Sequence, residues 1–335
     1  MSQPLLGVLK RHRRALGLLA KVLIAALPLY FLIAGARFDL GRQAALLQEP
    51  AAIALLFCIW ALSFVLLVAW RWQFVSRILG LELPLGFALG AHLAGVFMSS
   101  WLPGSIGGDI WKAYRYGALL KGTDGQTTAY LSVVLDRVFG LYALVLCGSL
   151  CVLLEIGLWL DSAYAALALL LLGLCLLLSL AGGLVLTAAF PLPASLAALL
   201  ERGKARYRLV EGFAGHLRAM RENKRLFLPC ISISIVIQVL NVVFFGTIAT
   251  LVTGQAVSFI TMSSVFTISL LITILSMAPG GLGVGHLMVE LLFSDVGLPS
   301  GADVFNVFFV LTTLFSLIGA LPYLLPDAAS RRRAR

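Results

Sequence analysis

The chain has 335 residues, of which 61% are hydrophobic and only 12% are charged, and its formal net charge is +10. A soluble protein of this length carries about twice that charged fraction, so the composition excludes an ordinary soluble domain and favours an all-α membrane protein with several spans. The basic residues gather at the ends of apolar segments as topology determinants do, which argues against a nucleic-acid partner.

Six full membrane spans are expected from the apolar runs and the basic residues that flank them. The first, about 15–36, is too long for the apolar core of a signal peptide, and the basic cluster before it places the N-terminus in the cytoplasm. Arg71 and Arg77 follow the second span and are interpreted as cytoplasmic anchors. The tail SRRRAR places the C-terminus on the same side. The remaining spans are predicted at about 51–70, 127–154, 163–189, 227–252 and 302–325.

Two segments, about 85–121 and 258–297, do not fit as full spans. The neighbours of the first both lie on the cytoplasmic side, and the neighbours of the second both lie outside. A full crossing of 85–121 would place Lys112, Arg115 and Lys121 outside. Each segment is therefore predicted to be a re-entrant hairpin, and irregular backbone at membrane depth needs protein or a water-filled cavity around it.

The tips of the two predicted hairpins have the same form, P-G-x-[I/L]-G. The first is PGSIG at 103–107 and the second is PGGLG at 279–283. Because the hairpins enter from opposite faces, each between two spans, the match predicts an inverted repeat, an architecture typical of alternating-access transporters. Chance is the alternative, since the chain contains 32 glycines.

A candidate site for a lipid headgroup follows the first tip. The backbone N–H groups at a glycine-rich helix start attract anions, and two basic side chains would add to this attraction. Asp109 would meet an amine or hydroxyl group, or would cap the helix. The alternative for the basic pair is ordinary snorkelling to the interface. The residues of this candidate site are Gly107, Gly108, Asp109, Lys112 and Arg115.

Asp136 and Arg137 lie about ten residues into a predicted span, where charges are costly and normally paired. Adjacent helical residues point about 100° apart, so the two cannot be each other's main partner. We predict that Arg137 pairs with Asp109, and that Asp136 pairs with Lys112 or Arg115. A structural ion-pair network and a direct substrate role both remain open.

Polar residues elsewhere give weaker signals. His286 and Glu290 lie one turn apart after the second tip, where they would form a protonation switch; the alternative is that His286 is simply a satisfied tip histidine. Gln238 and Asn241 would line a cavity or link helices. The second tip itself contributes Pro279, Gly280, Gly281 and Gly283. The five cysteines lack metal-ligand spacing, so neither a metal nor a cofactor is expected.

The segment at about 190–226 carries eight basic residues opposite apolar ones at helical spacing. This pattern predicts a cytoplasmic amphipathic helix on the anionic inner leaflet, with a solvated loop as the alternative.

Three stretches, LPGSIGGDIWKAYR, LDRVFGL and APGGLGVGH, resemble the lysylphosphatidylglycerol synthase transmembrane domain family. This is the flippase-like domain of the multiple peptide resistance factor and of standalone bacterial proteins, and the likeness covers about 12–325. It implies translocation of a polar-headed lipid, aminoacylated phosphatidylglycerol in the best-known members. Many relatives have a Glu soon after the second group of glycines, where this chain has Gly285 and His286. The positions that match are Gly107, Gly108, Asp109, Lys112, Asp136, Arg137, Pro279, Gly280, Gly281 and Gly283.

These observations lead to one expectation for the whole chain. It is a single integral membrane domain over 1–335, without the synthase domain, that flips a phosphate-bearing lipid across the bacterial inner membrane. Its expected partners are a phospholipid or polyprenyl-phosphate glycolipid and a separate lipid-synthesising enzyme. The alternatives are a polyprenyl-phosphate-dependent glycosyltransferase and a non-transporting accessory of a lipid-modifying complex. No catalytic motif was found, so we expect no enzyme activity.

Overall fold

The computed structural model describes residues 49–101, 106–120, 125–187, 219–220, 222–275, 281 and 283–321. The predicted first span, the C-terminal tail and nearly all of the basic segment at 190–226 lie outside the described residues. So do Pro103, Pro279 and Gly280 of the two predicted tips.

The described part of the chain is helical, and five of its helical stretches are long and apolar enough to cross a membrane. These five correspond to the second to sixth predicted spans and confirm a multi-pass, all-α membrane protein. They are α3 (Pro50–Trp60) continuing through η1 (Ala61–Leu66) into α4 (Leu67–Ile78), α7 (Gly125–Leu154), α9 (Ala165–Thr187), α12 (Phe227–Thr253) preceded by η3 (Lys224–Leu226), and α15 (Gly301–Ser316) continuing into η5 (Leu317–Ala320).

Two pairs of shorter helices occupy the two predicted hairpin segments. In the first, α5 (Leu85–Trp101) packs against α6 (Ile106–Gly117); in the second, α13 (Phe259–Leu275) packs against α14 (Val284–Asp295). Both α5 and α13 have 17 residues, so each is about 25 Å long, shorter than a hydrocarbon core of about 30 Å. A further short helix, α8 (Ile156–Leu160), joins α7 to α9.

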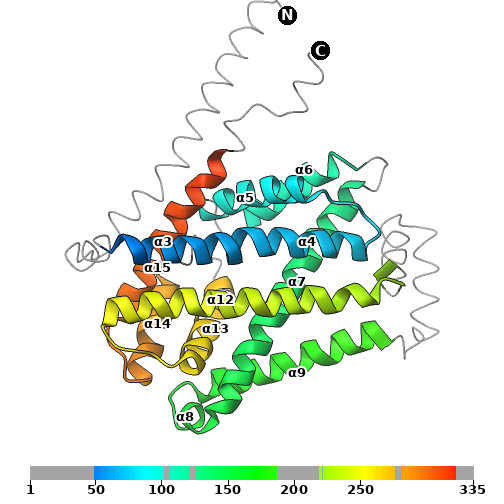
Figure 1. Cartoon of the computed structure of the whole chain (residues 1–335). Coiled ribbons are helices and arrows are strands. Elements are labelled where there is room, and N and C mark those ends of the chain that lie inside the picture. Colours follow the sequence, from blue (N-terminus) through cyan, green and yellow to red (C-terminus); the bar gives the residue numbers. More distant parts are fainter. Residues whose placement is uncertain are drawn as a thin grey trace, which may run out of the picture.

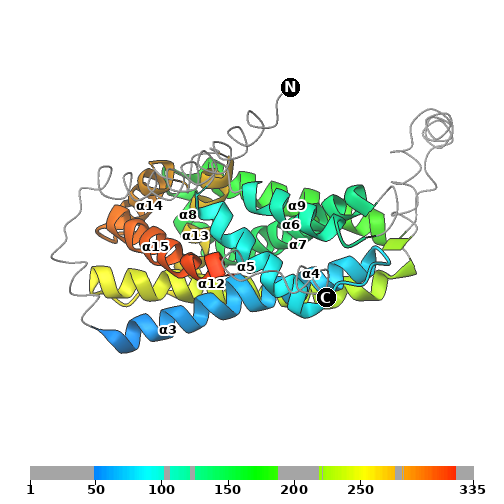
Figure 2. The same cartoon turned by 90° about the horizontal axis from the view of Figure 1, so that it is seen from above.

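The long helices run in opposite directions in the two halves of the chain (Figures 1 and 2). The α3–α4 helix and α12 lie side by side and are antiparallel, and α12 contacts α3, η1 and α4. In Figure 1, α7 descends from the end of α6 towards α8, whereas α15 rises from α14. Thus α4 and α12 run in opposite directions, and so do α7 and α15.

An aromatic cluster fills the interior where α12, α13, α14 and α15 meet. The Phe245 ring lies 5.2 Å from Phe266, 5.6 Å from Phe308 and 6.4 Å from Phe293, measured between ring centroids. These tilted and edge-to-face ring contacts pack the four helices against one another at this end of the bundle. Polar and charged side chains lie instead around α4, α6 and α7.

One long helix contains a π-helical turn, η1, between α3 and α4. A π turn shifts the backbone hydrogen-bond register and can leave a carbonyl oxygen available to another group, which is why such turns often mark functional sites. Here the Phe64 carbonyl accepts a hydrogen bond from the His92 ring of α5, with 2.8 Å between Nε2 and the oxygen. The turn therefore attaches α5 to the long helix beside it.

Candidate functional site

A buried ion pair joins three of the long helices. Arg71 of α4 donates from Nε and Nη2 to the two carboxylate oxygens of Asp136 on α7, at 2.8 and 3.1 Å, and from Nη1 to Ser234 Oγ on α12 at 3.0 Å. The side chains of Arg71 and Asp136 are only 6% and 2% exposed. Gly140 makes room for the guanidinium, since a Cβ there would lie 3.2 Å from Nη1.

This pair corrects two predictions. Asp136 was expected to pair with Lys112 or Arg115, and Arg71 was interpreted as a cytoplasmic anchor. Arg71 instead lies inside a helix that continues to Ile78, and it faces the protein. The Arg71 guanidinium donates two parallel hydrogen bonds to the Asp136 carboxylate and a third to Ser234. It satisfies both buried charges better than an ammonium would, because the planar guanidinium matches the two oxygens of a carboxylate.

A second ion pair lies beside the first and is partly exposed. Arg137 of α7 donates from Nε and Nη2 to the carboxylate of Asp109 on α6, at 2.7 and 3.0 Å. This confirms the predicted pairing of Arg137 with Asp109. The Arg137 side chain is 56% exposed and that of Asp109 is 19% exposed. Asp136 and Arg137, which are consecutive residues of α7, thus form ion pairs with different partners on two sides of the helix.

Lys112 of α6 is held in a closed cage. Its Nζ lies 3.4 Å from Asp109 Oδ1, 3.4 Å from His92 Nδ1 and 5.1 Å from the centroid of the Trp72 ring. Because His92 Nε2 donates to the Phe64 carbonyl, its Nδ1 is the acceptor for the Lys112 ammonium. The Lys112 side chain is only 2% exposed, so its contact with a headgroup would be indirect, through Asp109.

The electrostatics of α6, which lies outside the five candidate spans, follow from this cage. Burial favours the neutral form of Asp109, but Lys112 and Arg137 outweigh it and hold the pKa of the carboxyl below its usual value. Burial lowers the pKa of the Lys112 ammonium, and Asp109 opposes this effect. Asp109 therefore remains a carboxylate near neutral pH and is shared by two cations.

The other predicted residues of this site take different positions. The Arg115 guanidinium lies over the ring of Trp111, 5.8 Å from its centroid, within the same helix. Gly107 is half-buried, and Gly108 is buried against α5. A Cβ at Gly108 would overlap the carbonyl of Gly95, so α5 and α6 cross here at backbone contact. Binding of an anion to the N–H groups of these glycines stays a prediction.

The change Gly108→Ala should therefore destabilise the protein. Overpacking of this kind typically costs about 1–3 kcal/mol, because the backbone of Gly95 cannot move aside without separating the two helices. The measurement is thermal unfolding of the purified protein in detergent. Gly173→Ala on α9, where a Cβ meets nothing within 4 Å, is the matched control. Equal melting temperatures for the two variants would contradict the close crossing.

The second tip is held by hydrogen bonds of the His286 ring. His286 Nε2 lies 2.6 Å from Asn306 Oδ1 on α15, and its Nδ1 accepts the backbone N–H of Gly283 at 3.3 Å. Gly281 and Gly283 have φ of +72° and +82°, a backbone conformation that favours glycine. The pair of His286 and Asn306 thus links the start of α14 to the following span, as Asp109 and Arg137 link α6 to α7.

Glu290 has a separate structural contact. Its Oε2 accepts the backbone N–H of Ala302 at 2.7 Å, which satisfies a free donor in the first turn of α15. His286 and Glu290 therefore have different partners, although they lie one turn apart.

Gln238 and Asn241 of α12 are both buried, and the carbonyl oxygen of each side chain has no hydrogen-bond partner among the described residues. They follow Ser234 at spacings of four and seven residues, so all three lie on one face of α12. This face continues from the Arg71–Asp136 pair towards the aromatic cluster. A cavity-lining role stays a prediction.

The contacts above join Arg71, His92, Asp109, Lys112, Asp136 and Arg137 into one charge cluster. No site role was predicted from the sequence for two of them, Arg71 and His92. Within the described part of the chain, no three His, Cys, Asp or Glu side chains are arranged to hold a metal ion.

Comparison with known proteins adds one finding. The model of the family described as the lysylphosphatidylglycerol synthase TM region matches residues 18–324. No curated protein matches the chain. The matched region includes both ion pairs, the Lys112 cage and both tips, and it covers most of the sequence. The chain therefore belongs to the lysylphosphatidylglycerol synthase transmembrane-region family, as the resemblance predicted.

Proposed function

We propose that this protein moves a phosphate-bearing lipid between the leaflets of the bacterial cytoplasmic membrane, with both termini in the cytoplasm and without catalysing a covalent reaction. The observation that carries the proposal is the exposed, cationic edge of the charge cluster at Arg137. Membership of the family supports a membrane function related to lipids.

The described cluster has more cations than carboxylates. Arg71 and Asp136 neutralise each other in the interior, whereas Lys112 and Arg137 share the single carboxylate of Asp109. Lys112 and Arg137 therefore share one positive charge in excess, and Arg137 is the member of the cluster with the greatest exposure. An anionic headgroup is the ligand that this arrangement favours.

The depth of Arg137 strengthens this argument. It lies twelve residues after Gly125, about 18 Å along a candidate span, and more than half of its side chain is exposed. A guanidinium in contact with hydrocarbon at that depth costs several kcal/mol, so such residues normally face a water-filled cavity or a polar ligand. An opening large enough for a headgroup would meet this requirement.

Asp109 suggests how a phosphate enters and leaves. A phosphodiester presents two oxygens to a guanidinium in the same forked geometry as a carboxylate. The headgroup would replace Asp109 at Arg137, while Asp109 stays beside Lys112. When the lipid departs, Asp109 would return to Arg137, so that no buried charge is left alone in either state.

The packing of the helices supports an inverted repeat with two re-entrant hairpins. The contacts of α4, α5, α6 and α7 recur among α12, α13, α14 and α15: each short helix packs on its hairpin partner, and each hairpin packs on its two flanking helices. The halves also exchange contacts, since α13 packs on α7 and α5 packs on α15 and η5. With the opposite directions in Figure 1, this arrangement fits alternating access.

The change Asp109→Asn tests the proposal. Loss of the carboxylate removes the counterion of Lys112 and the group that displaces phosphate from Arg137, so leaflet exchange should slow strongly. The measurement is exchange of a fluorescent phosphatidylglycerol in liposomes containing the purified full chain, with Glu290→Gln, remote from the cluster, as the control. An unchanged rate for Asp109→Asn would remove the proposed site.

A further inference from the structure

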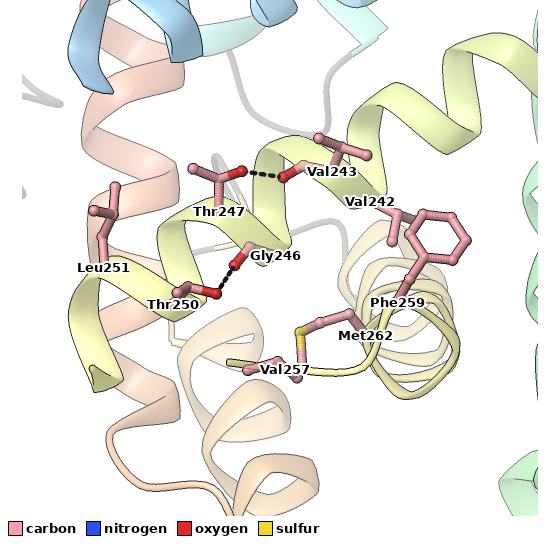
Figure 3. A pocket seen from close by; sticks show the side chains of 9 residues that line it. All are labelled: Val242, Val243, Gly246, Thr247, Thr250, Leu251, Val257, Phe259 and Met262. Carbon is pink, nitrogen blue, oxygen red and sulfur yellow. Dashed lines mark hydrogen bonds between the residues drawn. The ribbon is translucent and has the colours of Figure 1, made fainter. Parts of the chain in front are cut away.

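An apolar groove lies along α12 (Figure 3). It has a volume of about 310 Å³ and lies between the C-terminal half of α12 and the segment that leads into α13. Its lining consists of Val242, Val243, Gly246, Thr247, Thr250, Leu251, Val257, Phe259 and Met262.

The two hydroxyl groups on the wall of the groove are already satisfied. Thr247 Oγ1 donates to the Val243 carbonyl at 2.7 Å, and Thr250 Oγ1 donates to the Gly246 carbonyl at 3.0 Å, as Figure 3 shows. Both threonines therefore bond to their own helix, and hydrocarbon is the ligand chemistry that suits the groove.

Gly246 gives the groove its depth. A glycine in a helix is destabilising relative to alanine, so its presence usually has a packing reason. Here a Cβ would meet only the flexible Met262 side chain, at an ordinary contact distance of 3.6 Å. Packing of the protein does not require glycine at this position, but any larger side chain would extend into the groove.

The position of the groove indicates what fills it. α12 is a candidate membrane span, and the exposed rim residues Val243, Leu251 and Phe259 face outward. Gly246 lies twelve residues beyond Ser234, so the groove is about 18 Å along α12 from the charge cluster, in the other half of the helix. A groove of this volume admits a single hydrocarbon chain, whereas a helix with its side chains is about 10–12 Å wide.

We propose that this groove binds one acyl chain of a bilayer lipid, in the leaflet opposite to the charge cluster. This site is independent of the proposed transport, because its residues touch none of the charged groups described above. Its occupant is recognised by its slender shape and by the absence of polar groups.

Photo-crosslinking of the full chain in phosphatidylglycerol liposomes tests this proposal, with a lipid that carries a diazirine midway along one acyl chain. Peptide mass spectrometry should find residues 242–262 labelled severalfold more than leucines of α9, although these leucines are more exposed. These leucines are Leu169, Leu170, Leu176 and Leu177. Equal labelling of α12 and α9 would overturn the proposal.

Two variants make the test specific. Gly246→Leu should remove the excess labelling, and Thr250→Phe, which changes an exposed rim residue, should do the same if Gly246→Leu does not fold. Gly173→Leu on α9, also in open space, should leave the labelling of α12 unchanged. Unchanged labelling in a folded groove variant, or peptide crosslinks showing residues 15–36 or a second copy of the chain in the groove, would also overturn the proposal.

Discussion

The change Arg71→Met should destabilise the protein by about 3–5 kcal/mol, because it leaves the Asp136 carboxylate buried without its counterion. Arg71 makes both hydrogen bonds to that carboxylate and a third to Ser234, and so holds α4, α7 and α12 together. The measurement is thermal unfolding in detergent. Arg77→Met is the matched control, because Arg77 is an exposed arginine of the same helix.

A double variant separates the charge from the contact. Replacing the whole pair, with Arg71→Met and Asp136→Leu together, removes both buried charges and should recover much of the stability that either single change loses. If Arg71→Met melts at the same temperature as Arg77→Met, the buried pair does not support the fold.

The second large effect is expected from Arg137→Gln, and it concerns lipid rather than stability. The pair that Arg137 makes is partly exposed, so its loss should cost at most about 1 kcal/mol, and Asp109 keeps Lys112 as a partner. Loss of a charge-assisted, forked contact of about 1.5–3 kcal/mol should weaken the binding of an anionic lipid about ten- to a hundredfold. Native mass spectrometry with phosphatidylglycerol measures this affinity.

Arg71→Met, in the neighbouring ion pair, is the variant with which Arg137→Gln is compared. A variant that unfolds as readily as Arg71→Met would make Arg137 a structural residue. A variant that is stable and retains the lipid with unchanged affinity would mean that the headgroup binds elsewhere. We expect the adjacent residues Asp136 and Arg137 to divide the two roles that the sequence left open, with Asp136 structural and Arg137 in contact with the lipid.

Much of this architecture could be predicted because it depends on local pattern. The apolar runs predicted the spans, and the angle between adjacent helical residues correctly assigned different partners to Asp136 and Arg137. The pairing of Arg137 with Asp109 was predicted from their opposite charges, and the structure confirms it.

The partner of Asp136 could not be predicted in this way, because Arg71 is 65 residues away and looks like a membrane anchor. A basic residue shortly after an apolar run is typical of topology determinants, and only the continuation of the helix to Ile78 places Arg71 inside it. His92 was missed for a similar reason, since its role depends on a π turn in another helix. Glu290 reaches Ala302 across a turn, a contact that spacing within one helix does not indicate.

The central claim is that a lipid phosphate is recognised at Arg137 during transfer between leaflets. The most direct measurement compares leaflet exchange of two fluorescent lipids in the same liposomes, one with a phosphodiester headgroup and one with an uncharged sugar headgroup of similar size. We expect the wild-type chain to accelerate exchange of the phosphate lipid selectively, and Arg137→Gln to abolish that selectivity. Equal acceleration of both lipids by the wild-type chain, or undiminished selectivity in Arg137→Gln, would contradict the claim.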